Sequence, residues 1–138
     1  MSNLKQLPLH AVHQTAGGKF APFAGYNMPV QYPAGVMTEH LHTRTKAGLF
    51  DVSHMGQLKL PLSAVDALET LLPTDIRGLP IGRQCYSLLT TESGGVLDDL
   101  MIARRQDDYL LVVNASRRDA DLEHLDRHIK DVVTIDDR

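Results

Sequence analysis

The chain has 138 residues, of which 43% are hydrophobic and 22% charged, and its formal net charge is −3. A composition of this kind predicts one soluble globular domain with a single core and excludes an intrinsically disordered chain. Because 14 basic residues stand against 17 acidic ones and form no basic run, a nucleic-acid backbone is a poor candidate partner.

The N-terminus and the cysteine content bear on the compartment. The first ten residues, MSNLKQLPLH, have neither the apolar centre of a signal peptide nor the arginine-rich pattern of a transit peptide, and no apolar run in the chain approaches membrane-spanning length. The single cysteine, Cys85, supports neither an intramolecular disulfide nor a cysteine metal cluster. We therefore expect a reducing compartment, with the cytoplasm as the default and no membrane partner.

Turn and helix-end residues mark the elements of the N-terminal part. Residues 8–16 predict a short helix between a first-turn proline and a capping glycine. Residues 18–33 contain three prolines, which favours an irregular or edge-strand path. A second helix is expected over 34–47, a strand over 49–53, and a half-buried strand over 57–62, where leucines alternate with other residues.

The second half of the sequence predicts a meander between two helices. Ser63 and Asp66 resemble a capping box that opens a helix ended by Pro73, and Ser116 and Asp119 repeat the signature before the last helix. Three strands and a terminal strand are predicted over the segments CYSLLT, VLDDLMIAR, YLLVVN and VVTIDDR. Together the elements predict an α+β fold, a largely antiparallel sheet with helices packed on one face.

Two adjacent carboxylates, Asp98 and Asp99, lie inside the strand predicted over 96–104. Neighbouring side chains of a strand leave opposite faces of the sheet, so only one of the two can point into ordinary solvent. A desolvated carboxylate is costly unless a partner stabilises it. One of these acids therefore predicts a polar site set into an apolar wall.

Other candidate residues have simpler explanations. His124 and His128 are four residues apart on a predicted helix, but Leu125 stands where a zinc protease carries its glutamate, so we expect no metal site. No serine or cysteine nucleophile that could partner His54 can be identified from the sequence spacing, so His54 is expected to be structural. Cys85, between large neighbours, is expected to act as a small hydrophobic residue of the sheet.

Four segments carry a resemblance to a known family. AGYNMPVQY, EHLHTRTKAGLFDVSHMGQLKL, GGVLDDLM and YLLVVNAS occur in an order and spacing typical of the N-terminal part of the glycine cleavage aminomethyltransferases, the T-protein family. The chain resembles this family from about Leu7 to its C-terminus. The resemblance implies that residues 1–138 are the N-terminal part of a ring-shaped, multi-domain folate-binding fold whose C-terminal portion is absent.

The resemblance also implies a reaction and its site. The family transfers the one-carbon unit of an aminomethyl group, carried on the lipoyl arm of the H-protein, to tetrahydrofolate and releases ammonia, with no metal. Asp99, the second acid of GGVLDDLM, would reach the pterin and carry the main catalytic role, while Asp98 would face outward or tie down the adjacent turn. The residues that the resemblance implies along the folate pocket are Met55, Tyr86, Asp99, Met101, Val112 and Asn114.

Some departures and alternatives stay open. GYNMP, with Tyr26 and Asn27, replaces the family's usual GWEMP, and Ala103 stands where relatives often carry tyrosine, which leaves substrate preference undecided. A folate-binding iron–sulfur maintenance protein, or the folate-binding domain of a flavin-dependent dimethylglycine or sarcosine oxidoreductase, would share much of this sequence. Taken by itself, the 138-residue chain is expected to be inactive and to self-associate.

Overall fold

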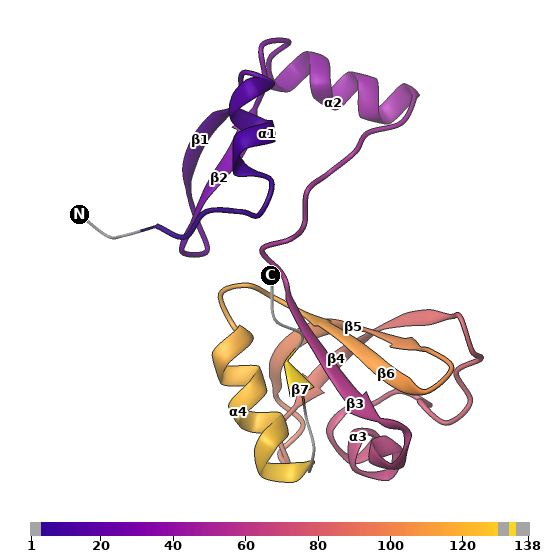
Figure 1. Ribbon diagram of the computed structural model, residues 1–138. Coiled ribbons are helices and arrows are strands. Elements are labelled where there is room, and N and C mark those ends of the chain that lie inside the picture. The colour runs from indigo at the N-terminus through magenta and orange to yellow at the C-terminus, as the bar shows by residue number, and fades with distance from the viewer. Residues whose placement is uncertain (1–3, 130–132, 135–138) are drawn as a thin grey trace. The chain divides into compact units, whose positions relative to one another are not determined.

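The computed structural model describes residues 4–129, 133 and 134. Backbone contacts divide the chain into two compact units, Met1–His54 and Met55–Asp137 (Figure 1). By contrast, length and composition predict a single domain. The hydrophobic core cluster belongs to the second unit, whereas Leu7 and Tyr26 are the buried hydrophobic residues described in the first. The first unit is therefore held together largely by backbone pairing and polar contacts.

The first unit is a hairpin with two helices. Its elements are α1 (His10–Thr15), β1 (Lys19–Phe23), β2 (Tyr26–Gln31) and α2 (Val36–Thr45). The strands pair antiparallel, and Ala24 and Gly25, with φ of 48° and 82°, form the turn with the positive φ values that a tight two-residue hairpin loop requires. In a two-stranded sheet both strands are edges, so Pro22 and Pro29 are tolerated and the predicted edge-strand path is confirmed.

The strand predicted over residues 49–53 is wrong. This segment has no strand, because Asp51 uses its side chain to turn the backbone. The backbone N–H of Ser53 donates to Asp51 Oδ1 at 2.9 Å, while Asp51 Oδ2 lies 2.7 Å from His13 Nε2. Such a local side-chain contact competes with strand pairing, so the apolar residues of LFDVS do not form the strand that they predict.

The second unit is a five-stranded sheet with helices. Its elements are β3 (Gly56–Pro61), the short helix η1 (Leu62–Ala64), α3 (Val65–Leu71), β4 (Gln84–Thr90), β5 (Val96–Arg104), β6 (Asp108–Val113), α4 (Arg118–His128) and β7 (Val133–Thr134). The strand order is β4-β5-β6-β3-β7, and every neighbouring pair is antiparallel. The predicted α+β class and the β4-β5-β6 meander are confirmed. The remainder of the predicted terminal strand lies outside the described residues.

Strand alternation separates a core face from a second face of this sheet. Leu100 and Ile102 of β5 point into the same cluster as Leu68 of α3 and Leu125 of α4, so both helices cover one face. Near α4 the packing is tight: a Cβ atom added at Gly56 would lie 2.7 Å from a Val113 methyl group and 3.0 Å from Arg118 Cγ, which explains the glycine. The alternate side chains of the strands, which do not point into the core, form the opposite face of the sheet.

The two predicted helix caps are not used. Ser63 lies within η1, so Ala64 takes the N-cap position and α3 starts at Val65 without a side-chain cap, while the Asp66 carboxylate pairs with Arg77. Likewise, α4 starts at Arg118 without a side-chain cap from Ser116. Throughout residues 4–129 and 133–134, each helix falls short of the length and apolarity needed to cross a membrane.

Candidate functional site

Three of the residues implied along the folate pocket lie in a row on the sheet face opposite the core. Tyr86 of β4 pairs with Met101 of β5, and Met101 pairs with Val112 of β6. Tyr86 is 60% exposed, while Met101 and Val112 are half-buried. The row presents an aromatic ring and two apolar side chains across three strands, which is a surface suited to a flat ring.

Asn114 organises the polar part of the same site. This residue follows β6, and its Nδ2 donates to Asp98 Oδ1 at 3.0 Å and lies 3.2 Å from both the carbonyl oxygen and the Oδ1 of Asp99. An amide nitrogen carries two hydrogens, so the three acceptors share them. Asn114 therefore ties the beginning of β5 to the end of β6 and joins both carboxylates at one point.

Met55 completes the set at the same end of the sheet. It immediately precedes β3, whose first residue Gly56 pairs with Val113, the neighbour of Asn114. The side chain of Met55 is half-buried. All six residues that the resemblance implies therefore belong to the second unit, and the strand pairing brings them to one end of its sheet.

Asp98 is not where it was predicted to be. It was expected to face outward or to tie down the adjacent turn, but it shares the core face with Leu100 and pairs in register with Leu89, which is fully buried. Its Oδ1 accepts the Asn114 amide, and its Oδ2 is buried without a hydrogen-bond partner among the described residues. One acid of the pair is turned inward, as strand alternation requires, but that acid is Asp98.

Asp99 takes the other face of β5. It is half-buried and pairs in register with Leu88, two residues from Tyr86. Partial desolvation, hydrogen bonding to the Asp99 carboxylate and the charges of Asp99 and Asp98 raise the pKa of the Tyr86 phenol. Arg104 does not pair with Asp99, because its guanidinium lies over the ring of Tyr109, 4.9 Å from the centroid. Asp99 is thus presented toward the row of Tyr86, Met101 and Val112.

A third acid was missed in the sequence. Asp121 of α4 is only 1% exposed, and burial, followed by the neighbouring Asp98 carboxyl, raises its pKa to about 7. A signal was present: Leu125 and Ile129 form the apolar stripe of the helix, and one more step of four residues toward the N-terminus reaches Asp121. An acid on the apolar face of a helix is the same kind of sequence anomaly as Asp98 and Asp99 within their strand.

The remaining candidates behave as ordinary structural residues. Cys85 is half-buried beside the core, and burial raises the pKa of its thiol. The rings of His124 and His128 lie 4.7 Å apart, and His128 Nδ1 contacts the carbonyl oxygen of His124 at 2.8 Å. Among the residues that the structure describes, no group of three side chains could hold a metal ion.

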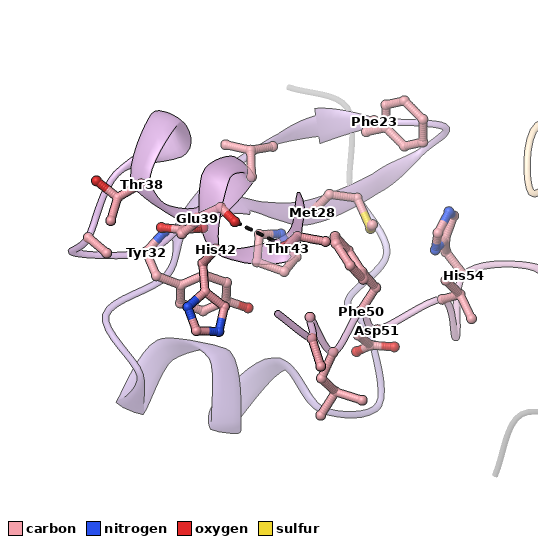
Figure 2. A pocket seen from close by; sticks show the side chains of 17 residues that line it. Phe23, Met28, Tyr32, Thr38, Glu39, His42, Thr43, Phe50, Asp51 and His54 are labelled. Atoms are coloured by element: carbon pink, nitrogen blue, oxygen red, sulfur yellow. Dashed lines mark hydrogen bonds between the residues drawn. The ribbon is translucent and has the colours of Figure 1, made fainter. Parts of the chain in front are cut away.

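The first unit contains a cavity of about 750 Å³ that the sequence did not predict. Figure 2 shows its lining, in which Met28 of β2, Glu39 of α2 and Phe50 surround the space. Glu39 Oε1 accepts the backbone N–H of Tyr32 at 2.9 Å. At the margin of the cavity, the His54 ring packs edge-on against Phe23 at 6.0 Å, consistent with its expected structural role.

One wall of this cavity is fixed by a polar chain. The Tyr32 hydroxyl lies 2.7 Å from His13 Nδ1, and His13 Nε2 lies 2.7 Å from Asp51 Oδ2. Burial acts to raise the pKa of Asp51, but the hydrogen bonds from His13 and Ser53 outweigh it and leave the pKa lowered. Burial and the charges of Asp51 and Glu39 raise the pKa of Tyr32. These hydrogen-bonded side chains connect α1, the end of β2 and the segment before His54.

Comparison with known proteins agrees with these observations. An aminomethyltransferase of Rubrobacter xylanophilus is 45% identical over 130 residues, which cover 94% of this chain and 35% of the relative. A mitochondrial aminomethyltransferase of Dictyostelium discoideum is 44% identical over 135 residues, which cover 97% of this chain and 34% of the relative. The chain thus spans about a third of the length of these relatives.

A solved structure and a family match identify the family to which the chain belongs. The crystal structure of the glycine cleavage system aminomethyltransferase T from Bartonella henselae matches with a TM-score of 0.89 and 43% identity, over 96% of this chain and 38% of that one. The family described as the GCVT N-terminal domain matches residues 9–138, nearly the whole sequence. With its antiparallel sheet, its helix-covered core and this match, the chain belongs to the GCVT N-terminal domain family.

Proposed function

We propose that this chain forms the tetrahydrofolate-binding part of a glycine cleavage aminomethyltransferase. The reaction transfers the one-carbon unit of an aminomethyl group, carried on the lipoyl arm of the H-protein, to tetrahydrofolate and releases ammonia. The observation that carries the proposal is the place of Asp99, on the sheet face that bears Tyr86, Met101 and Val112 and within reach of the Asn114 amide.

The side chains of the site fit a pterin. A pterin has flat apolar faces and an edge of hydrogen-bonding groups, so it needs both kinds of contact. Tyr86, Met101 and Val112 would cover one face, and Asn114 and Asp99 would meet the edge. Met55 would close the same end of the sheet.

Asp99 is proposed as the catalytic residue, acting by charge and position. Tetrahydrofolate would supply the nitrogen that accepts the one-carbon unit. A fixed anion beside it orients the ring and favours positive charge at the reacting centre. Asn114 holds the carboxylate in advance, because its amide contacts both the Oδ1 and the backbone carbonyl of Asp99.

The names of the relatives favour this function over the two related ones. The similar proteins from Rubrobacter and Dictyostelium are both named aminomethyltransferases, and neither name refers to a flavin or an iron–sulfur protein. The H-protein as partner, the lack of a metal and the cytoplasm as the compartment stay predictions. The mitochondrial location in the name of the Dictyostelium relative is said of that protein alone.

The methionines of the chain provide a test of where tetrahydrofolate binds. The full-length protein would be labelled with ¹³C at its methionine methyl groups, and signals would be assigned by methionine-to-leucine substitutions. We expect tetrahydrofolate to shift the methyl signals of Met55 and Met101, because the pterin ring current acts at short range. Met28, which lines the cavity of the first unit, and Met37 of α2 serve as internal controls and should shift little.

A different pattern would refute the assignment. Shifts at Met28 with none at Met55 and Met101 would place the ligand in the cavity of the first unit. If none of the four signals moved at a saturating concentration, the described part of the chain would not be the binding site at all.

A further inference from the structure

Two carboxyl groups enter the helix-covered face of the second unit's sheet. Asp98 comes from β5, and Asp121 comes from α4, where it is almost completely buried. Asp98 Oδ2 and Asp121 Oδ2 are both buried and neither meets a hydrogen-bond donor among the described residues, yet the Asp121 carboxyl lies within hydrogen-bonding reach of the Asp98 carboxyl. Two ionised carboxylates in one desolvated site repel each other, so such a site favours a state that holds one proton.

The surrounding charges do not stabilise a second negative charge here. Arg117, which precedes α4, favours the ionised form of Asp121, whereas Asp98 and Asp99 of β5 oppose it. Burial and the Asp98 carboxyl outweigh the arginine and raise the pKa of Asp121 to about 7. Asn114, which follows β6, donates its amide to Asp98 Oδ1 at 3.0 Å, so Asp98 is the acid of the pair that already accepts a hydrogen bond.

Arg118 is a second cation near the start of α4. The side chain of Arg118 packs over Gly56 of β3, where its Cγ and Cδ atoms would lie 3.0 and 3.3 Å from an added Cβ. It contributes a positive charge to this end of the helix. The burial of Asp121 and the neighbouring acids nevertheless decide its state.

We propose that Asp98 and Asp121 hold one proton between them, and that Asp121 is a positioning residue that keeps Asp98 ionised as the acceptor of the Asn114 amide. A protonated Asp121 places no second negative charge beside Asp98, so Asp98 keeps its place against Asn114. Asn114 in turn keeps its contacts with Asp99. The consequence for ligand binding rests on the proposed function, because it is there that Asp99 is assigned to tetrahydrofolate.

The proposal gives a direction for the pH dependence. Below neutral pH Asp121 carries the proton and the contacts of Asn114 are maintained. As the pH rises through about 7, Asp121 ionises and the cluster of Asp98, Asp99 and Asp121 acquires a third negative charge. Repulsion then displaces Asp98 and loosens the contact between Asn114 and Asp99, so affinity for tetrahydrofolate falls with rising pH.

A titration without ligand tests the shared proton directly. The full-length protein would be labelled with ¹³C at its aspartate carboxyl groups, and the signals followed from pH 3 to pH 9. We expect a carboxyl signal that titrates near pH 7 in the wild type, is absent from Asp121→Asn and persists in Asp119→Asn, the matched control with an exposed acid on the same helix. If the Asp121 signal of the wild type titrates below pH 5, the shared proton is refuted.

Ligand binding tests the positioning role. Between pH 6 and pH 8.5 the wild type and Asp119→Asn should lose affinity for tetrahydrofolate by about tenfold, whereas Asp121→Asn, whose amide cannot ionise, should change by less than about twofold. A parallel loss in Asp121→Asn would overturn the role assigned to Asp121. A wild type that binds no tetrahydrofolate at any pH would refute the proposed function instead, and the ligand-free titration would still decide whether the proton is shared.

Discussion

At the scale of single residues, one amide connects the features that define the site. Asn114 reaches Asp98 on one face of β5 and Asp99 on the other, because its Nδ2 lies 3.0 Å from Asp98 Oδ1 and 3.2 Å from both the Oδ1 and the backbone carbonyl oxygen of Asp99. The sequence predicts that one of two adjacent acids must be turned inward, since strand alternation requires it. It cannot say which one, because that depends on the register of β5 against β4 and β6.

In the first unit, acid should weaken the contact between His13 and Asp51. The Asp51 pKa is lowered in the folded state, so its contribution to stability is present above the ordinary value of 3.8 and is lost as the pH falls through the folded pKa. We expect Asp51→Asn to destabilise this unit by about 1 to 3 kcal/mol at pH 7 and to flatten its stability profile between pH 5 and pH 2. Amide hydrogen exchange along β2 would measure the change.

The control is Asp107→Asn, which removes an exposed carboxylate from the connection between β5 and β6. Its exchange profile along β2 should match that of the wild type. Equal protection of β2 in Asp51→Asn and the wild type at pH 7 would show that the contact between His13 and Asp51 does not hold the unit together.

At the scale of elements, the sequence succeeds where the periodicity is long and regular. The strand predicted over 96–104 coincides with β5, and the strand predicted over 57–62 differs from β3 by one residue at each end. Both helices of the second unit are found, but the predicted side-chain caps are absent, because Ala64 and Arg117 occupy the two N-cap positions. The missed elements are those in which a side-chain contact competes with backbone pairing, as Asp51 does in LFDVS.

In the candidate site too, some features can be predicted from the sequence and others depend on how the elements pack. Tyr86, Met101 and Val112 come from the family resemblance, and their adjacency follows only once the strands are paired in register. Asp121 could have been found by continuing the apolar stripe of α4, but its meeting with Asp98 depends on how the helix packs on the sheet. The cavity of the first unit has no sequence signal, because its lining is gathered from separate elements.

At the scale of the whole molecule, the chain leaves apolar side chains uncovered. Val36, Met37 and Leu41 of α2 are exposed, as are Leu49 and Phe50 in the segment that follows. The chain also spans about a third of the length of its relatives. Exposed apolar surface of this extent favours association, so we predict that the 138-residue chain alone forms dimers or larger species and catalyses no transfer.

Light scattering across a range of concentrations would measure this association. We expect a mass above that of one chain, and we expect Leu41→Glu, which places a charge on the exposed face of α2, to reduce it. A single-chain mass at every concentration would contradict the prediction.

If Asp99 carries the chemistry of the site, the charge of its side chain should control the turnover of the full-length protein with saturating lipoylated H-protein. Asp99→Asn keeps the volume of the side chain and removes its charge, so we expect a loss of about a hundredfold in turnover, equivalent to about 3 kcal/mol of transition-state stabilisation. The control Asp107→Asn should keep the wild-type rate. Turnover of Asp99→Asn within about twofold of the wild type would contradict the catalytic role proposed for Asp99.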